Sequence, residues 1–372
     1  MIIGVPKEIK NNEFRVGMTP GGVKEFVAHG HQVLVEASAG AGSSFTDAEY
    51  ATVGAELLSS AEEVFARADM IVKVKEPQAP EIAMLREGQI LYTYLHLAPD
   101  LPQTEGLLSS GVIGIAYETV ELPDRTLPLL APMSEVAGRM AAQVGAAYLQ
   151  KPNGGCGALM GGIPGVLPAK VIVLGAGVVG TNAAYVAMGM GADVTVMDVS
   201  LERLRHLDEI WGNRIRTCYS SRHNIEEMLF NVDLVIGAVL LPGAKTPWLI
   251  TREMLPGMKP GAVVVDVSVD QGGCIETTKP TTHADPVYFV EEVLHYGVAN
   301  MPGAVPKTST LGLTNATLRH GLALADKGWK QAAIDDAALA KGINVLEGKL
   351  VYEPVAEAHG MEYTPLEPLL GL

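Results

Sequence analysis

One short segment limits the fold of this chain more than any other. Residues 170–181 read KVIVLGAGVVGT, so Gly175, Gly177 and Gly180 form a G-x-G-x-x-G pattern directly after an apolar, β-branched run. That run predicts a buried strand, and the residues after it predict a helix. Gly175 permits a tight turn, Gly177 lets a ligand approach the backbone, and Gly180 lets the helix pack on the strand. The segment therefore predicts a βα unit that opens with a ligand-binding turn.

The residues around this turn indicate which ligand it binds. Free N–H groups and a positive dipole at the start of a helix favour a phosphate group. A second predicted strand, VTVMD, ends at Asp198, 18 residues after Gly180. An acid at this place accepts hydrogen bonds from a ribose 2′-hydroxyl and repels a 2′-phosphate, which favours NAD over NADP. Arg203 and Arg205 weaken that preference slightly, because a nearby arginine can receive a 2′-phosphate.

Short apolar runs alternate with amphipathic segments along most of the 372 residues. This alternation is typical of βαβ units and a parallel sheet. We expect strands at Ile2–Val5, Gln32–Glu36, Met70–Val74, Ile90–Leu95 and Val112–Tyr117, and again at Val171–Leu174, Val194–Met197, Arg214–Tyr219, Leu234–Val239 and Ala262–Val267. The two groups predict an α/β fold with two doubly wound, Rossmann-like parallel-sheet domains.

The boundary between these domains is expected near Ala131–Ser134, where the uncharged TLPLLAP gives way to a helical pattern. Helical patterns at Leu311–Ala325 and Lys330–Lys341 lie in a tail that is too short to be a domain. Long helices there return the chain to the first domain, which makes that domain discontinuous. We therefore expect a substrate domain at residues 1–131 and 306–372, an NAD-binding Rossmann domain at 132–305, and a cleft between them.

Composition narrows the class of protein further. With 27 Lys+Arg against 42 Asp+Glu, the net charge of −15 argues against nucleic acid or an anionic membrane as the main partner. The N-terminus has no signal-peptide pattern, and the uncharged run Val171–Ala192 is rich in glycine, so we interpret it as a buried βα unit. Cys156, Cys218 and Cys274 form no C-x-x-C pair, which indicates a reduced interior. We expect a soluble, cytoplasmic protein.

Polar residues that abruptly end apolar strands are candidates for a catalytic site, because ligands in open α/β sheets bind beyond the carboxyl ends of strands. Lys75 ends MIVKV, His96 ends ILYTYL, Asp270 follows VVVDVSV, and Arg15 precedes the helix start Thr19-Pro20. Taken alone, each has an ordinary explanation as a solvated charge, a buried histidine or a turn residue. Together, the cations suit a small carboxylate, and the histidine suits proton transfer at a carbonyl.

Longer motifs make the chain recognisable. They are MIIGVPKEIKNNEFRVGMTP, KVKEP, LHLAP, PMSEVAGRMA, GGIPGV-x-PAKVIVLGAGVVG, DVSVDQGGCIETTKPTTH and VANMPGAVPKTST. In this order, and over essentially the full length, the chain resembles the L-alanine dehydrogenases. It is similar, more distantly, to the NAD-binding component of proton-translocating transhydrogenases and to lysine-forming saccharopine dehydrogenases. The resemblance implies reversible conversion of L-alanine, NAD⁺ and water to pyruvate, ammonia and NADH, by a homohexamer with a mobile interdomain cleft.

The resemblance also implies roles for individual residues. Arg15 would hold the substrate carboxylate, Lys75 would lie near the carboxylate and the carbonyl oxygen, and His96 would be the acid/base at that oxygen. Asp270 would be a second acid/base beside the nicotinamide. Besides the three glycines, the implied NAD contacts are Ser134, Val178, Asp198, Arg203, Ser220, Val239, Leu240, Val267, Ser268, Val269, Asp270, Lys279, Val298, Ala299, Asn300 and Met301.

The chain departs from the family pattern in two places. Lys279 stands where an arginine is expected, which keeps the charge but loses the bidentate fork. Some relatives carry an acid and a histidine that can hold a divalent ion where this chain has Ala323 and Lys327, so we expect no metal. Cys156 lies in the glycine-rich connector and is interpreted as a bystander.

Two alternatives stay open. A transhydrogenase hydride-donor subunit would need no basic pair for a carboxylate, and it would pass hydride to NADP only with a membrane partner. A non-enzymatic NAD-sensing protein would have a dinucleotide site without proton-transfer groups, which Lys75, His96 and Asp270 disfavour.

Overall fold

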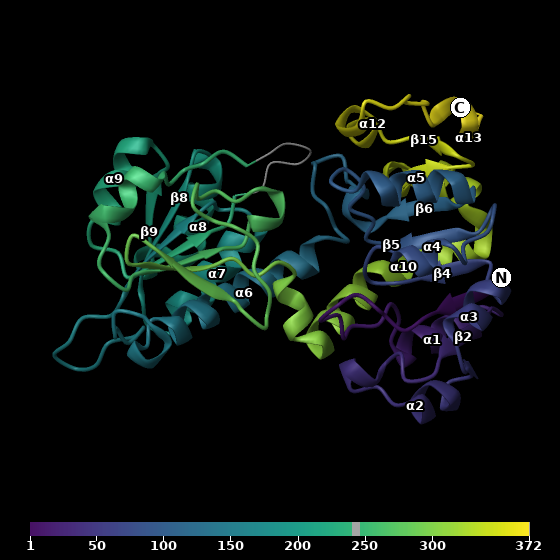
Figure 1. Ribbon diagram of the computed structural model, residues 1–372, viewed down its shortest axis with the longest axis horizontal. Coiled ribbons are helices and arrows are strands. Elements are labelled where there is room, and N and C mark those ends of the chain that lie inside the picture. Colours follow the sequence, from purple (N-terminus) through teal and green to yellow (C-terminus); the bar gives the residue numbers. More distant parts are fainter. Residues whose placement is uncertain (240–245, 372) are drawn as a thin grey trace. The chain divides into compact units, whose positions relative to one another are not determined.

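The computed structural model describes residues 1–239 and 246–371. The chain divides into two compact units, one made of Met1–Met133 and Gly303–Leu372 and the other of Ser134–Pro302 (Figure 1). The first unit thus contains both ends of the chain. From the sequence we expected the chain to pass between domains after residues 131 and 305. Each unit is built around one sheet and is described by itself.

The sheet of the first unit has eight strands in the order β15-β14-β6-β5-β4-β1-β2-β3. Strands β1 to β6 are parallel, whereas β14 is antiparallel to β6 and β15 is antiparallel to β14. Their bounds are Ile2–Val5 (β1), Gln32–Glu36 (β2), Glu56–Leu58 (β3), Met70–Val72 (β4), Ile90–Thr93 (β5), Ile113–Ala116 (β6), Ile343–Leu346 (β14) and Lys349–Leu350 (β15). The strand order reverses between β1 and β4, which is where open α/β sheets bind ligands.

The helices of this unit are α1 to α5 and α10 to α13. Thr19 caps α1 by accepting a hydrogen bond from the Gly22 N–H, as the Thr19-Pro20 pattern predicts. Ser60 caps α3 by accepting from the Glu63 N–H (3.4 Å), and the Glu63 carboxylate accepts from the Ser59 N–H (3.2 Å). The bounds are Pro20–Ala28 (α1), Asp47–Thr52 (α2), Ala61–Arg67 (α3), Ala79–Ile82 (α4), Leu101–Ser110 (α5), Pro306–Asp335 (α10), Ala337–Gly342 (α11), Glu353–His359 (α12) and Glu367–Leu370 (α13).

The second unit has a seven-stranded sheet in the order β12-β13-β11-β10-β7-β8-β9, in which only β12 is antiparallel to its neighbour. From β9 to β11 this is the usual order of dinucleotide-binding sheets. The strands are Lys170–Leu174 (β7), Asp193–Asp198 (β8), Arg216–Tyr219 (β9), Leu234–Gly237 (β10), Val263–Asp266 (β11), Val287–Val290 (β12) and Val293–Tyr296 (β13). The helices are Ala131–Tyr148 (α6), which enters the unit from the first, Val178–Gly189 (α7), Leu201–Trp211 (α8) and Arg222–Leu229 (α9).

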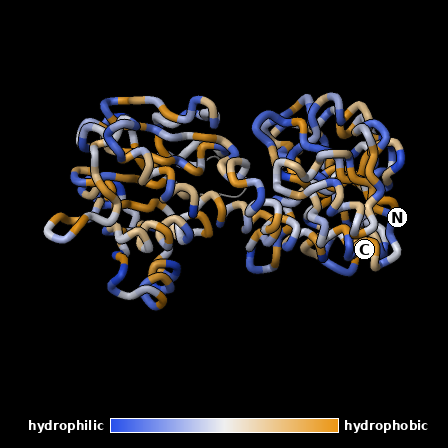
Figure 2. The backbone as a smooth tube through the Cα atoms, turned by 90° about the horizontal axis from the view of Figure 1, so that it is seen from below, coloured by the Kyte–Doolittle hydropathy of each residue, from blue (hydrophilic) through white to orange (hydrophobic). Residues whose placement is uncertain are grey.

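The predicted α/β class with two Rossmann-like sheets is confirmed, but both sheets are mixed rather than purely parallel. Central strands such as β10 and β11 are buried along their whole length, as expected for strands covered on both faces. Figure 2 shows hydrophobic stretches running through the interior of each unit. The antiparallel strands β12, β14 and β15 were missed, together with β3 and β13.

The uncharged run Val171–Ala192 folds as predicted into β7, a turn and α7. Among the described helices, none is long and apolar enough to cross a membrane. The thiols of Cys156, Cys218 and Cys274 are all free.

Candidate active site

The first unit brings three of the predicted site residues to one edge of its sheet. Arg15 lies in the segment after β1, Lys75 follows β4, and His96 follows β5. These three strands are neighbours, and their carboxyl ends meet at the edge where the strand order reverses. Lys75 and His96 therefore follow two adjacent parallel strands.

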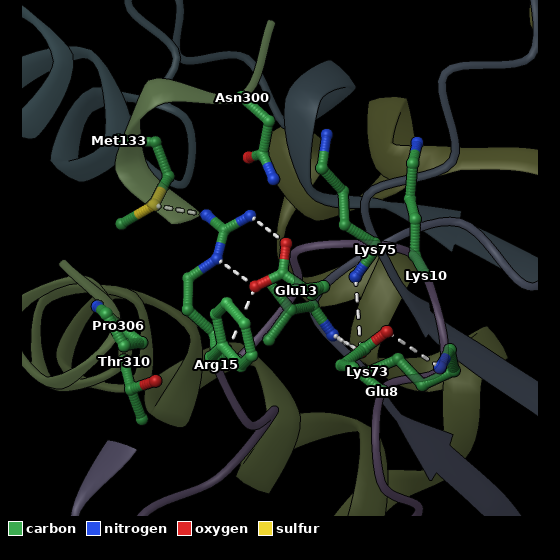
Figure 3. Close-up of polar contacts among 12 residues, drawn as sticks. Glu8, Lys10, Glu13, Arg15, Lys73, Lys75, Met133, Asn300, Pro306 and Thr310 are labelled. Carbon is green, nitrogen blue, oxygen red and sulfur yellow. Dashed lines mark hydrogen bonds and ion pairs between the residues drawn. The ribbon is translucent and has the colours of Figure 1, made fainter. Parts of the chain in front are cut away.

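Arg15 is 2% exposed and its guanidinium is fixed by a carboxylate from the same segment. Its Nε donates to Glu13 Oε1 (2.6 Å) and its Nη2 to Glu13 Oε2 (2.5 Å) (Figure 3). The Nε–Nη2 edge of the guanidinium therefore binds the Glu13 carboxylate. Its Nη1 points to the thioether of Met133 at 3.1 Å. Burial alone would lower the pKa of Arg15, but the Glu13 carboxylate raises it above its ordinary value. Arg15 is a permanently charged group inside the unit.

Strand β4 ends at Val72, two residues before the end that we expected, and Lys75 lies in a bend after it. The side chain is half-buried. The Lys75 N–H donates to Glu8 Oε1 (3.3 Å), and the Lys75 carbonyl accepts from the Thr93 hydroxyl (2.9 Å). The backbone on both sides of this lysine is thus hydrogen-bonded to side chains of neighbouring strand ends.

His96 adopts a left-handed backbone conformation, with φ at 49°. For a residue other than glycine this conformation is costly, and surrounding contacts must hold it. The His96 N–H donates to Glu118 Oε1 (2.6 Å), which also accepts from the Leu95 N–H (3.1 Å). The imidazole is 40% exposed. A strained histidine that is fixed through its backbone and open to solvent is typical of a functional residue.

One carboxylate, Glu76, lies among three basic groups of this site. Its Oε2 is 3.4 Å from His96 Nδ1, without the angle of a hydrogen bond, and its Oε1 is paired with the Lys10 ammonium. Burial would raise the pKa of Glu76, but His96, Lys75 and Lys10 together hold it well below its usual range. A permanent negative charge therefore lies beside Nδ1 of the imidazole.

Sequence reasoning missed three charged residues beneath this edge. Glu8, Lys73 and Glu81 are buried, and Lys73 is ion-paired with both carboxylates. Lys73 falls within the predicted strand Met70–Val74. The sequence alone does not reveal whether a charged side chain in such a strand is buried. The nearest signal was the acid in VPKE, which comes just after the first strand.

In the second unit, the glycine-rich turn has the geometry that its sequence predicts. Gly175 has φ at 103°, and a Cβ there would lie 2.6 Å from the Ala238 carbonyl oxygen. A Cβ on Gly180 would lie 1.8 Å from the Gly175 carbonyl oxygen. Helix α7 begins at Val178 with Gly177 as its N-cap. Backbone N–H groups at this helix start suit a pyrophosphate, so these residues fit a dinucleotide.

Asp198 ends β8 beside this turn and is 8% exposed. Its Oδ2 accepts from the Ala176 N–H (2.6 Å) and its Oδ1 from the Ser200 N–H (2.7 Å). Arg203 Nη1 lies 4.0 Å from Oδ2. The carboxylate thus joins the glycine turn to the start of α8.

Asp270 is exposed in a short 3₁₀ turn, Val269–Gln271, directly after β11. The last residue of β11, Asp266, anchors this loop and was missed from the sequence. Its Oδ1 accepts from the Ser268 N–H (3.0 Å), and its Oδ2 accepts from the N–H groups of Cys274 (2.9 Å) and Ile275 (3.2 Å). Burial raises the pKa of Asp266 to about 6, although these N–H donors lower it.

Most other predicted NAD contacts follow the carboxyl ends of strands in the second sheet. Ser220 comes after β9, Val239 after β10, Val267, Ser268 and Val269 after β11, and Val298, Ala299, Asn300 and Met301 after β13. Lys279 is exposed, with its ammonium 4.6 Å from the centre of the Tyr288 ring. Ser134 lies in α6, apart from the strand ends, and Leu240 lies outside the described residues.

The expectation of no metal ion stays a prediction. Within residues 1–239 and 246–371, no three His, Cys, Asp or Glu side chains are grouped so as to hold one. The Lys327 ammonium is paired with Asp335 at 2.6 Å.

Comparison with known proteins places the chain in a family. The model of the alanine dehydrogenase/PNT N-terminal domain matches residues 4–137, and that of the C-terminal domain matches residues 141–353. Alanine dehydrogenases of Methanococcus maripaludis and Halomonas elongata are each 56% identical over the full length of both chains. That of Mycobacterium tuberculosis is 54% identical over 98% of both.

Solved structures agree with this placement. An L-alanine dehydrogenase superposes with a TM-score of 0.94 at 50% identity, over 97% of this chain and 99% of its own. A transhydrogenase from Sinorhizobium meliloti reaches 0.83 at 28% identity, over 94% and 100%. The chain therefore belongs to the alanine dehydrogenase/PNT family, as an enzyme of the NAD-dependent amino-acid dehydrogenase class.

Proposed function

We propose that this enzyme catalyses the reversible oxidative deamination of L-alanine. In the forward direction L-alanine, NAD⁺ and water give pyruvate, ammonium, NADH and a proton. The observation that carries the proposal is the grouping of Arg15, Lys75 and His96 at the carboxyl edge of β1, β4 and β5. Two cations and an acid/base group at one sheet edge suit a small amino acid that must be held by its carboxylate while a proton moves.

Substrate binding is assigned to the first unit. The Glu13 carboxylate occupies the Nε–Nη2 edge of Arg15, so the substrate carboxylate meets the guanidinium at Nη1. The group now next to Nη1 is the Met133 thioether, and a carboxylate is a far better acceptor than sulfur. Lys75 places a second cation near the same carboxylate and the developing carbonyl oxygen.

Proton transfer is assigned to His96, with Asp270 as a second acid/base for ammonia or water. Because the Glu76 charge lies beside Nδ1, the proton of the neutral imidazole is favoured on that nitrogen. The other nitrogen, Nε2, then exchanges a proton with the hydroxyl or carbonyl oxygen of the reacting carbon. Such a group typically contributes about 10²–10⁴-fold to the rate.

NAD binding is assigned to the second unit, and NAD supplies the hydride acceptor. Gly177 leaves room for the pyrophosphate, while Gly175 and Gly180 let the turn and the start of α7 pack closely against the protein backbone. Asp198 has lone pairs left for the ribose hydroxyls besides its two backbone donors. Further contacts come from Arg203, Lys279 and the segments that follow β9, β10, β11 and β13. Asp198 disfavours a 2′-phosphate, so NAD is expected over NADP.

The test is a deamination assay with small L-amino acids, in which NAD⁺ and NADP⁺ are compared side by side. We expect NADH formation from alanine, reduced at least about 10²-fold in His96→Ala and strongly in Lys75→Ala, with NADH binding retained. Full activity in either variant would refute the assigned roles.

The transhydrogenase-like structure favours one second candidate, a hydride-donor subunit. That candidate predicts no alanine-dependent NADH and transfer to NADP only with a membrane partner.

We also propose that the chain works as a homo-oligomer, a hexamer by family analogy, in the cytoplasm and without a metal. The connector of the second unit exposes Leu159 (64%), Ile163 (59%), Val166 (60%) and Leu167 (86%), an uncharged surface that suits burial against another copy. Light scattering of the purified protein would measure its mass. Activity that survives a chelator would agree with the absence of a metal ion.

A further inference from the structure

A cluster of three buried charges lies beneath the substrate edge of the first unit. The side chains of Lys73, Glu8 and Glu81 are 0%, 2% and 2% exposed. Lys73 Nζ donates to Glu8 Oε2 at 3.0 Å and to Glu81 Oε1 at 2.6 Å. Replacing a buried ion pair by apolar residues is often neutral or stabilising, so this cluster is weakly explained by stability alone.

The cluster occupies the place where the strand order reverses. Strand β1 pairs with β4 through Ile3 and Gly4. Glu8, from the segment after β1, accepts hydrogen bonds from the backbone of the segment after β4. It therefore bridges two chain segments that the sheet itself does not join.

Through this bridge Glu8 reaches the backbone of Lys75. Glu8 Oε1 accepts from the N–H groups of Val74 (2.7 Å) and Lys75 (3.3 Å), while its Oε2 accepts from Lys73 (Figure 3). The Lys73 backbone is held on both sides, because its N–H donates to the Tyr92 carbonyl and its carbonyl accepts from the Tyr117 hydroxyl. One carboxylate thus fixes three successive residues that end at Lys75.

Glu81 is a matched neighbour with a different target. Its Oε1 accepts from the same Lys73 ammonium, but its Oε2 accepts from the Gln78 N–H at the start of α4 (2.7 Å). Glu8 and Glu81 carry the same charge and the same degree of burial. They differ in which backbone segment each holds.

We propose that Glu8 is a positioning residue for Lys75, which holds the turn of Lys73, Val74 and Lys75 so that the Lys75 ammonium meets the substrate. This inference rests on the proposed function, because it assumes that Lys75 binds the carboxylate and carbonyl of the amino acid. It requires an acceptor on both oxygens of residue 8. A glutamine has one acceptor and one donor, so it must present an NH₂ group either to Lys73 or to the two backbone N–H groups.

The experiment compares Glu8→Gln with Glu81→Gln in the full-length enzyme. A displacement of about 1 Å in a substrate-positioning group can cost about 10²-fold. We expect E8Q to lower kcat/KM for alanine by about 10- to 100-fold, mainly through KM, and E81Q to change that KM less than about twofold. Both variants should lose similar thermal stability, and NADH affinity, a property of the other unit, should stay unchanged in both.

The outcomes separate the two levels of inference. If E8Q keeps the wild-type KM for alanine, or if E81Q raises it equally, the positioning role is wrong although the enzyme is still an alanine dehydrogenase. If the wild type forms no NADH from alanine, the proposed function itself fails. Should E8Q not fold, Glu8→Asp and Glu81→Asp give the same comparison, because each keeps the charge and withdraws the carboxylate by one methylene.

Discussion

The two sheets have the same reversal of strand order, yet the edges proposed to bind ligands are built by different means. In the first unit, buried carboxylates pair with buried cations, as in Arg15 with Glu13 and Lys73 with Glu8 and Glu81. In the second unit, the carboxylates of Asp198 and Asp266 accept mainly from backbone N–H groups and so shape loops.

The difference follows from what each edge must hold. A small amino acid offers one carboxylate, which a rigid cation recognises well. A dinucleotide is long and carries a pyrophosphate that binds backbone N–H groups at a helix start. We therefore propose that one type of sheet holds an amino acid in the first unit and a dinucleotide in the second. The difference lies in the residues that follow the strands, not in the strands themselves.

The largest expected effect comes from removing the shared cation of the first edge. Lys73→Met leaves Glu8 and Glu81 buried without their counter-ion, which typically costs about 3–5 kcal/mol of unfolding free energy. Urea unfolding at pH 7, followed by a probe in the first unit, would measure it. As a control, Arg216→Met removes an exposed pair with Asp193 and should cost less than about 1 kcal/mol. Equal losses would mean that the first edge does not depend on buried charge.

The next prediction concerns Asp266 in the second unit and the way in which the unfolding free energy depends on pH. Burial raises the pKa of Asp266 to about 6 from an ordinary value of 3.8. The folded state therefore holds this proton more tightly than the unfolded chain. The stability that this proton contributes is full below pH 3.8 and is lost as pH rises through 6.

Two pKa units correspond to about 3 kcal/mol. In Asp266→Asn this contribution is absent, so the variant's unfolding free energy should fall less steeply than that of the wild type between pH 4 and 7. Urea titrations of both proteins at several pH values give the difference between their unfolding free energies. The contributions of the other carboxylates are the same in both proteins and cancel in this difference. Identical slopes would show that Asp266 is ionised throughout and that its N–H donors outweigh its burial.

Much of the fold could be predicted because a parallel strand buried on both faces is a continuous apolar run between turn residues. The runs at Ile2–Val5 and Gln32–Glu36 coincide with β1 and β2 residue for residue. Strands β12, β13 and β14 were missed for physical reasons. β12 and β13 join through Glu291 and Glu292, which adopt positive φ without the usual Asn or Gly, and β14 follows α11 without a break.

The position of a residue at a strand end was predictable where a polar residue follows an apolar run, as at Lys75, His96 and Asp270. The burial of Lys73 and Asp266 was not, because a charged residue inside or at the end of a strand shows its burial only when its partners are known. Glu8 is distant in sequence from Lys73, and the partners of Asp266 are backbone N–H groups, which the residue types around it do not reveal. Glu118 was missed because its partner is also distant in sequence: its carboxylate accepts from the backbone N–H of His96, which follows β5.

A smaller effect is expected from the carboxylate that holds His96. Glu118→Ala leaves the N–H groups of Leu95 and His96 without this acceptor, at about 1–3 kcal/mol of stability. Because the left-handed conformation of His96 then loses its support, kcat for alanine should fall. Glu118→Gln keeps one acceptor for the His96 N–H and should recover most of kcat. If alanine and glutamine behave alike, the strain at His96 is held by other contacts.

The smallest effect concerns Lys279, a cation among the proposed NAD contacts of the second unit. Tyr288 places its ring 4.6 Å from the Lys279 ammonium, and its hydroxyl accepts from the Lys279 N–H (2.8 Å) and donates to the Thr277 carbonyl (2.9 Å). Tyr288→Phe removes only the hydroxyl and should weaken NADH binding by a few-fold, about 0.5–1 kcal/mol. Tyr288→Leu also removes the ring, at a further 0.5–1 kcal/mol or so for an exposed cation–π contact. Isothermal titration of NADH would rank the three proteins. Equal affinities would mean that Lys279 contributes nothing through Tyr288, and that backbone N–H groups and carboxylates suffice for the cofactor edge.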